Sequence, residues 1–305
     1  MQDILNKINR KAGLDLVSLL AEGLTGSELN SLLLEVFDRK VSNLDASELL
    51  KLYKLNRFVK PADVDVIRIR QKELDSLRLL EASGFESMEL SPVSLLGVSS
   101  VLGTVSQKKI MSAIRGTEVL SDATNAMAIH IAFLRKSGNI KDGVVKYCTT
   151  QRHVRTPEIK VKGFTPHFKI ACMVSSGKDA GNFSFEKDAL LDHFHALQKL
   201  LNDVFSVDVK YFKLQAREGY REPKGLIHSV FSEISKSLPV RIGEESSKNN
   251  YYKGIQYKAV IEIGAQEIEI ADGGFVTWTQ QLLENKKERM LISGIGIEYL
   301  NNLLR

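Results

Sequence analysis

Apolar residues recur at helical spacing along the N-terminal part of the chain. One such set, three or four positions apart, is Leu29, Leu32, Leu33 and Phe37. Asp45, followed three positions later by Glu48, predicts a capped helix start. The pattern stops at Pro61, because proline cannot continue a helix. We therefore predict a helical N-terminal region over residues 1–65, which carries no recognisable chemistry and is a candidate surface for a protein partner.

The rest of the chain mixes helical and strand patterns. Helices are predicted over residues 66–83, 185–205 and 225–238, and strands over residues 85–92, 144–154, 168–174 and 207–214. Residues 251–274 alternate between apolar and polar positions, which predicts two strands joined at Gly264. A last apolar strand runs into Gly294 and Gly296 and then a helix. This mixture predicts an α+β core domain over residues 66–305.

Two of these strands enclose a basic segment. Pro157, Gly163 and Pro166 lie between them, and strand interiors do not tolerate such residues, so we predict an antiparallel hairpin with a long tip. Basic side chains crowd into this segment: Arg152, His153, Arg155, Lys160, Lys162, His167 and Lys169. The hairpin is either a solvated basic surface or an anion site, since a guanidinium can donate two parallel hydrogen bonds to a phosphate.

Composition limits the cellular context. The net charge of +5 on 305 residues permits a nucleotide or nucleic-acid partner without requiring one. Cys148 and Cys172 are too few for a disulfide framework, which favours a reducing compartment. No apolar run is long enough to span a membrane, and residues 1–11 lack a signal-peptide core. We expect a cytoplasmic protein with no membrane partner.

The hairpin resembles the second signature motif of the class II aminoacyl-tRNA synthetases, in its histidyl form. A strand, an Arg-x-x-Arg pair, a loop and a returning strand follow one another, although Val154 replaces the motif's glutamate. Arg152 falls on the phosphate-binding arginine, Arg155 on the second arginine and Phe168 on the aromatic residue of the returning strand. The resemblance implies that Arg152 and Arg155 are the catalytic residues, and that Arg152 and Phe168 bind ATP.

The other two class II motifs flank the hairpin in the family's order. Residues 66–92, a long helix and then a strand ending at Pro92, resemble the first motif, which implies a homodimer. Gly294 and Gly296 resemble the glycines of the third motif, which implies that they bind ATP by letting the backbone approach the adenine. Tyr299 stands where that motif has its arginine.

Elements of the histidyl type imply a substrate site. Asp122 and Thr124 take the positions of its glutamate and threonine, although Asp122 is equally a candidate helix N-cap. The tyrosine pair and the glycine pair also match, and they complete the implied substrate-binding set: Tyr251, Tyr252, Gly273 and Gly274. Ser247 and Phe275 replace two arginines of these elements.

The acids that follow offer a metal site or a solvent face. The resemblance places Glu262, Glu267, Glu269 and Asp272 on or beside the strands that carry the family's metal-binding acids. We take Glu267 and Glu269 as the candidate Mg²⁺ ligands, since Mg²⁺ prefers carboxylates. Acids at alternate strand positions are equally typical of a surface exposed to solvent.

Taken together, the resemblance implies an α+β fold with a class II synthetase-like antiparallel β-sheet flanked by helices, preceded by the helical N-terminal region. It implies a histidyl-tRNA synthetase paralogue that binds ATP, Mg²⁺ and an amino acid or other carboxylic acid. Charging of tRNA is not expected, because Ile170 and Val174 replace the residues that read the imidazole and no anticodon-binding domain follows.

Three functions remain open at this point. The first is an ATP-dependent, adenylate-forming ligase whose acceptor is not tRNA. The second is a non-catalytic regulatory or scaffold subunit that resembles the regulatory subunit of ATP phosphoribosyltransferase. The third is RNA binding through the basic hairpin, which strong salt dependence of the affinity would reveal.

Overall fold

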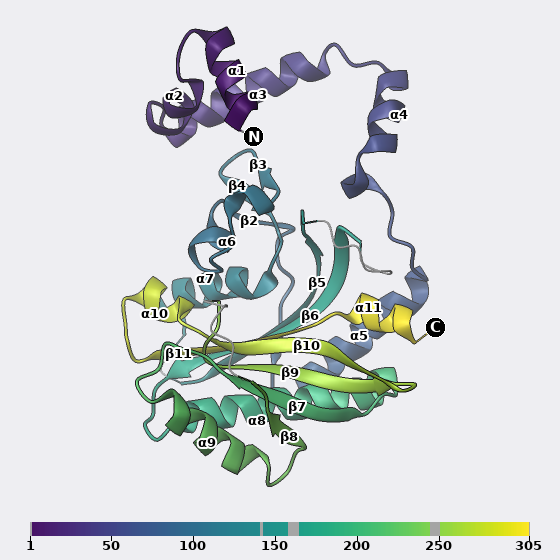
Figure 1. Ribbon diagram of the computed structural model, residues 1–305, viewed down its shortest axis with the longest axis vertical. Helices are drawn as coiled ribbons and strands as arrows, with labels where there is room; N and C mark the ends of the chain where they lie inside the picture. The colour runs from purple at the N-terminus through teal and green to yellow at the C-terminus, as the bar shows by residue number, and fades with distance from the viewer. Residues whose placement is uncertain (1, 141–142, 158–164, 245–250, 305) are drawn as a thin grey trace.

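The computed structural model describes residues 2–140, 143–157, 165–244 and 251–304. Figure 1 shows a helical N-terminal region that lies beside a core built on one large sheet. Lys160, Lys162 and Gly163 of the predicted hairpin tip, and Ser247, lie outside the described residues. Within the described part of the chain, no helix combines the length and the apolar character needed to cross a membrane.

The N-terminal region is helical, as predicted. Thr25 and Asp45 each form a capping box with the glutamate three residues on, which fixes the starts of two helices. The elements are α1 (Gln2–Ala12), α2 (Leu16–Glu22), α3 (Gly26–Val41), α4 (Ala46–Leu55) and the short η1 (Arg57–Val59). None of these helices buries a side chain, and Leu55 is 85% exposed. The apolar spacing therefore predicts the helices correctly but not their lack of burial.

Eight strands form the main sheet, in the order β1-β5-β6-β11-β10-β9-β7-β8. The pairs β1/β5 and β7/β8 are parallel, and the other pairs are antiparallel. The bounds are β1 (Glu86–Ser87), β5 (Val145–Val154), β6 (His167–Lys178), β7 (Val209–Ala216), β8 (Val240–Ile242), β9 (Lys253–Ile263), β10 (Gln266–Val276) and β11 (Glu288–Ile295). The predicted hairpin and the turn at Gly264 are confirmed, whereas the strand predicted over residues 85–92 has only two residues.

Helices cover the two faces of this sheet (Figure 1). On one face, α5 (Val66–Ala82), α8 (Ser184–Lys199), α9 (Pro223–Ile234) and α11 (Ile297–Leu303) pack into the largest apolar cluster, which contains Phe194 and Phe212 stacked 4.0 Å apart. On the other face, α6 (Val98–Val101), α7 (Ala123–Lys136) and α10 (Trp278–Leu283) form a second cluster around Met127 and Trp278. The predicted helix over residues 185–205 is α8 continued by the π-helical turn η3 (Leu200–Val204).

A smaller sheet lies before α7. It contains β2 (Val93–Leu95), β3 (Ser112–Ala113) and β4 (Thr117–Val119) in the order β2-β4-β3, and η2 (Gln107–Lys109) precedes β3. The buried Glu118 carboxylate of β4 accepts hydrogen bonds from the backbone N–H groups of Gly97 and Ser99. These bonds tie the small sheet to α6.

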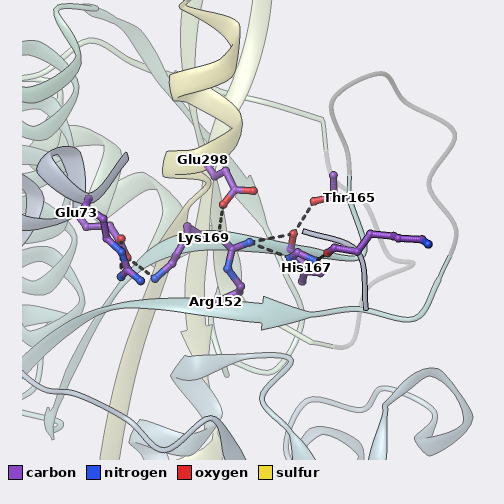
Figure 2. Close-up of polar contacts among 8 residues, drawn as sticks. Glu73, Arg152, Thr165, His167, Lys169 and Glu298 are labelled. Atoms are coloured by element: carbon purple, nitrogen blue, oxygen red, sulfur yellow. Dashed lines mark hydrogen bonds and ion pairs between the residues drawn. The ribbon is translucent and has the colours of Figure 1, made fainter. Parts of the chain in front are cut away.

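The pleat of the β5–β6 hairpin decides which side chains reach which face. Arg152 pairs with Lys169 across the strands, and His153 pairs with Phe168. Lys169 Nζ lies 2.6 Å from the Glu73 carboxylate of α5, so this pair faces the α5 side (Figure 2). His153 accepts a hydrogen bond from the backbone of α7, so it faces the opposite side. Neighbouring strand residues alternate between the two faces of a sheet, so Arg152 faces α5 whereas His153 faces α7.

Candidate functional site

A cavity of about 760 Å³ lies on the α7 side of the sheet. Its walls come from the start of α7, the ends of β5 and β6, the β9–β10 pair and the turn from β11 into α11. Most of the residues that the sequence selects line it: Asp122, Thr124, Arg155, Phe168, Tyr251, Tyr252, Glu269, Gly294 and Gly296. Segments far apart in the chain thus meet at one site, within the size range of small-molecule cavities.

Asp122 provides a fixed negative charge at the start of α7. Its Oδ1 accepts hydrogen bonds from the N–H group and the hydroxyl of Thr124, at 2.9 and 2.7 Å, and its Oδ2 accepts one from the Tyr251 hydroxyl at 2.5 Å. Burial alone would raise the pKa of Asp122, but His153 and the Tyr251 hydrogen bond outweigh it, so the pKa lies below its usual value. Asp122 is both the N-cap of α7 and an ionised side chain in the cavity wall.

A second carboxylate of the cavity wall lies on β10. Asp272 of β10 accepts hydrogen bonds from the Tyr252 hydroxyl at 2.9 Å and from the Gln256 amide at 2.7 Å. Lys258 Nζ lies 3.3 Å from the same carboxylate. The rings of Tyr251 and Tyr252 meet edge to face, with centroids 4.7 Å apart. The tyrosine pair therefore links the two acidic groups and holds both in place.

Arg155 brings positive charge to the cavity. It lies at the end of the β5 hairpin strand, and its guanidinium carbon is 5.3 Å from the centroid of the Phe168 ring. Contact with an aromatic face holds the planar guanidinium without using up its hydrogen-bond donors. Arg155 is thus placed to meet an anionic group of a ligand.

Arg152 does not line the cavity. Figure 2 shows its guanidinium between Glu298 of α11 and His167. Arg152 Nη2 donates to Glu298 Oε2 at 2.7 Å, and Nη1 donates to His167 Nδ1 at 2.9 Å. Because arginine has only donors, His167 accepts at Nδ1 and donates through Nε2 to the Lys60 carbonyl, 2.7 Å away. Arg152 therefore joins α11 to the chain that leads from the N-terminal region.

Comparison with solved structures shows that the fold of this chain is a known one. A histidine–tRNA ligase subunit of Alicyclobacillus acidocaldarius superimposes with a TM-score of 0.60 at 12% identity, over 82% of this chain and 96% of that one. An ATP phosphoribosyltransferase regulatory subunit/histidyl-tRNA synthetase of Bacillus halodurans gives 0.59 at 10% identity, over 82% of each chain. A structure named as a threonyl-tRNA synthetase of Aeropyrum pernix gives 0.60 at 13%, over 78% of this chain and only 59% of that one.

The core has the class II aminoacyl-tRNA synthetase fold. No protein-family model matches the sequence, and neither does any curated protein sequence. At identities of 10–13% the likeness concerns the fold and not the ligand. The resemblance inferred from the sequence motifs is confirmed at the level of the fold, and the cavity residues must be judged on their own contacts.

Within this class II fold, the structure separates the two hairpin arginines that the motif pairs. Arg155 reaches the cavity, whereas Arg152 lies on the α5 side and is engaged by Glu298. A shift of one residue along a strand moves a side chain to the opposite face, which is why matching the motif by sequence did not determine the face of Arg152. Catalysis and ATP binding by Arg152 stay predictions, and its position does not support them.

The predicted metal ligands are engaged by cations. Glu267, which does not line the cavity, pairs with Lys210 at 3.0 Å and accepts from the Tyr211 hydroxyl at 2.7 Å. Glu269 lines the cavity and pairs with Lys213. Among the described residues, no three His, Cys, Asp or Glu side chains lie where they could hold a metal ion together. These contacts do not fit a preformed Mg²⁺ site, because the ion would have to displace lysine from Glu269.

The glycine pair makes room for the tyrosines rather than for a ligand. Gly273 and Gly274 do not line the cavity. A Cβ at Gly273 would lie 2.5 Å from Tyr257 Cε1, and a Cβ at Gly274 would lie 2.7 Å from Tyr252 Cδ1. Both distances are too short for real contacts. Gly273 therefore lets the Tyr257 ring lie against the strand, and Gly274 does the same for the Tyr252 ring.

Gly274→Ala is expected to displace the Tyr252 ring and to lower the free energy of unfolding by about 1–3 kcal/mol, as overpacking does. Thermal unfolding measures the loss. Gly294→Ala is the matched control, because a Cβ there would meet only Ile170 Cγ2, at 3.8 Å. Equal stability of the two variants would show that Gly274 does not position Tyr252.

Two residues of the site were not selected from the sequence. Glu298, which engages Arg152, lies far from it in the chain, and no local pattern predicts that contact. His153 was grouped with the basic residues of the hairpin, yet it is a buried residue of the cavity wall. The sequence offered one indication of this, because adjacent strand residues such as Arg152 and His153 point to opposite faces of a sheet.

Proposed function

We propose that the cavity binds a small molecule with an amino group, such as an amino acid, and that the protein acts through this binding as a regulatory or scaffold subunit. The observation that carries the proposal is the half-buried, ionised Asp122, which three hydrogen bonds from Thr124 and Tyr251 hold in place. A carboxylate fixed in this way is preorganised to accept hydrogen bonds from an ammonium group.

The charge of the cavity wall supports this choice over an ATP-dependent enzyme. Among the described lining residues, the acids are Asp122, Glu269, Asp272 and Glu298, and the permanent cations are Lys109 and Arg155. Arg152 is engaged by Glu298, and Tyr299 stands at the position of the third motif's arginine. Lys213, Lys258 and Arg152 pair with Glu269, Asp272 and Glu298. Among the described residues Asp122 forms no such ion pair with a lysine or arginine, and its charge favours a ligand with a positive charge over a triphosphate, which preorganised cations would stabilise.

Thermal unfolding with each standard amino acid, without and with Mg-ATP, tests the proposal. A ligand that binds only the folded state raises the free energy of unfolding by about 2.7 kcal/mol when its concentration is a hundred times its dissociation constant. We expect one amino acid or a related group to raise the melting temperature without ATP. Stabilisation by Mg-ATP alone would contradict the proposal.

Adenylate formation remains the second candidate because Arg155 reaches the cavity and Glu269 lines it. In that case Arg155 would bind the carboxylate of the activated acid, and Glu269 would have to exchange Lys213 for a magnesium ion. Pyrophosphate exchange that depends on an amino acid separates the two candidates. Exchange above background would establish the enzyme, and binding without exchange would support the regulatory subunit.

The two arginines are expected to differ when replaced. Arg155→Ala should weaken ligand binding about ten- to a hundredfold, because it removes a charge-assisted hydrogen bond worth about 1.5–3 kcal/mol. Arg152→Ala should not weaken binding, because Arg152 does not line the cavity, and it should lower stability, because it leaves Glu298, 4% exposed, without Arg152. Calorimetric titration and thermal unfolding of both variants measure these effects. If Arg152→Ala loses binding and Arg155→Ala keeps it, Arg152 and not Arg155 is the ligand-binding arginine.

A further inference from the structure

A short segment of the N-terminal region contacts the end of the β5–β6 hairpin. It consists of η1 and of Lys60, which directly follows η1. The Arg57 guanidinium donates through Nη2 to the Thr156 carbonyl, just after β5. The Lys60 carbonyl accepts from His167 Nε2, at the start of β6, over 2.7 Å. Residues 57–60 are therefore bonded to both strands of the hairpin at the end where β5 finishes and β6 begins.

The local sequence prepares this segment for its contacts. The Asn56 side chain accepts from the Phe58 N–H group at 3.0 Å and so caps η1. Pro61 disfavours a helical backbone at the residue before it, and Lys60 is extended, with φ −75° and ψ 142°. The Lys60 carbonyl is thus directed to His167 and not into a helical turn. Lys60 Nζ donates to the Tyr53 carbonyl of α4, so the segment is also tied to the helices that precede it.

This end of the hairpin carries positive charge of the cavity. Arg155 lines the cavity and directly precedes Thr156, and its N–H group donates to the Pro166 carbonyl at 2.8 Å. The Thr156 hydroxyl donates in turn to the carbonyl of Lys109, which also lines the cavity. The Arg57 bond therefore ends on the residue that joins the two permanent cations of the described cavity wall.

We propose that Arg57 is a positioning residue of the cavity, because its bond to Thr156 holds the hairpin end so that Arg155 is in place before a small molecule binds. This inference rests on the proposed function, since the affinity that it concerns is that of the cavity. A side chain that is already in place loses less conformational entropy on binding, which raises the affinity. Binding in the cavity and the position of residues 57–60 are then coupled, and such coupling is reciprocal. The helical N-terminal region thus acts on the cavity through this segment.

A second arginine supports the hairpin from the α5 side. Figure 2 shows Arg152 against His167, and the Thr165 hydroxyl donates to the His167 carbonyl at 2.5 Å. This contact acts on the start of β6, whereas the Arg57 bond acts on the residue next to Arg155. Replacing Arg57 therefore tests the position of Arg155 most directly.

Substitutions of Arg57 test the inference in the full chain. Arg57→Ala removes the bond to Thr156, and Arg39→Ala is the matched control because Arg39 pairs with Glu35 within α3. Each protein is titrated calorimetrically with the standard amino acids, one at a time. We expect Arg57→Ala to bind about three- to tenfold more weakly, the effect of losing one hydrogen bond, and Arg39→Ala to bind as the wild type does. Arg57→Lys should restore most of the affinity, because an ammonium group can donate to the same carbonyl.

A double-mutant cycle separates positioning from a merely structural role. If Arg57 acts through Arg155, Arg57→Ala should have no further effect on binding in the Arg155→Ala background. Equal affinity of Arg57→Ala and the wild type would overturn the inference, and so would losses that add in the double variant.

Hydrogen exchange tests the contact without any ligand. The Arg155 N–H group, which donates to Pro166, should exchange about three- to tenfold faster in Arg57→Ala than in the wild type or in Arg39→Ala. If no amino acid binds the wild type, the proposed function fails, and faster exchange in Arg57→Ala still supports the positioning of the hairpin end by Arg57. An unchanged exchange rate would overturn the inference whether or not an amino acid binds.

Discussion

Replacing Asp122 by asparagine is expected to weaken binding of an amino-group ligand by about ten- to a hundredfold, since a hydrogen bond to a charged group is worth about 1.5–3 kcal/mol. The variant keeps a side-chain oxygen that can accept from the Thr124 N–H group, so the cap of α7 survives. The charge is lost, together with the oxygen that accepts from the Tyr251 hydroxyl. Calorimetric titration of wild type and variant measures the difference.

Asp122→Ala separates the structural role of this residue from its role in binding. It removes the cap as well as the charge, and we expect a further loss of about 1 kcal/mol in the free energy of unfolding. Thermal unfolding of the two variants reports that loss. If Asp122→Asn binds the ligand as tightly as the wild type, Asp122 is only a helix cap and the cavity has no fixed amine site.

Glu73→Ala is expected to lower the free energy of unfolding by about 3–5 kcal/mol, the usual effect of breaking a buried ion pair. Glu73 and Lys169 are 5% and 8% exposed, and their charged atoms are 2.6 Å apart. Without Glu73, the Lys169 ammonium remains buried between α5 and the hairpin, and no other acid among the described residues forms an ion pair with it. Denaturant unfolding measures the loss.

The matched control replaces both members of this pair with apolar residues. Glu73→Leu with Lys169→Met leaves no charge buried, so most of the lost stability should return. Binding per folded molecule should be unchanged in all these variants, because Lys169 faces α5 and not the cavity. If Glu73→Ala is as stable as the wild type, this ion pair does not hold α5 against the hairpin.

Local patterns predicted the elements that carry the site. The hairpin was recognisable from β-branched residues and loop breakers, and the turn at Gly264 from alternation. Those signals act over a few residues, and strand periodicity shows which side chains share a face. Arg152 was placed with Arg155 because both match the motif by residue type, although a separation of three residues along a strand favours opposite faces.

Contacts between distant segments could not be predicted in this way. Glu298 engages Arg152 from a helix at the other end of the core, and Glu73 meets Lys169 from α5. Each contact depends on how helices pack on the sheet, and no spacing in the chain encodes it. The same limit applies to the role of Gly274, which is set by the position of the Tyr252 ring.

Calorimetric titration of the full chain with amino acids, in the absence of ATP, tests the central claim most directly. The account predicts saturable binding of at least one amino acid, weakened in Asp122→Asn and Arg155→Ala and preserved in Arg152→Ala. Binding that requires Mg-ATP, or that is lost in Arg152→Ala while Asp122→Asn binds normally, would contradict it. The second result would return the site to the ATP-binding arrangement implied by the sequence motifs.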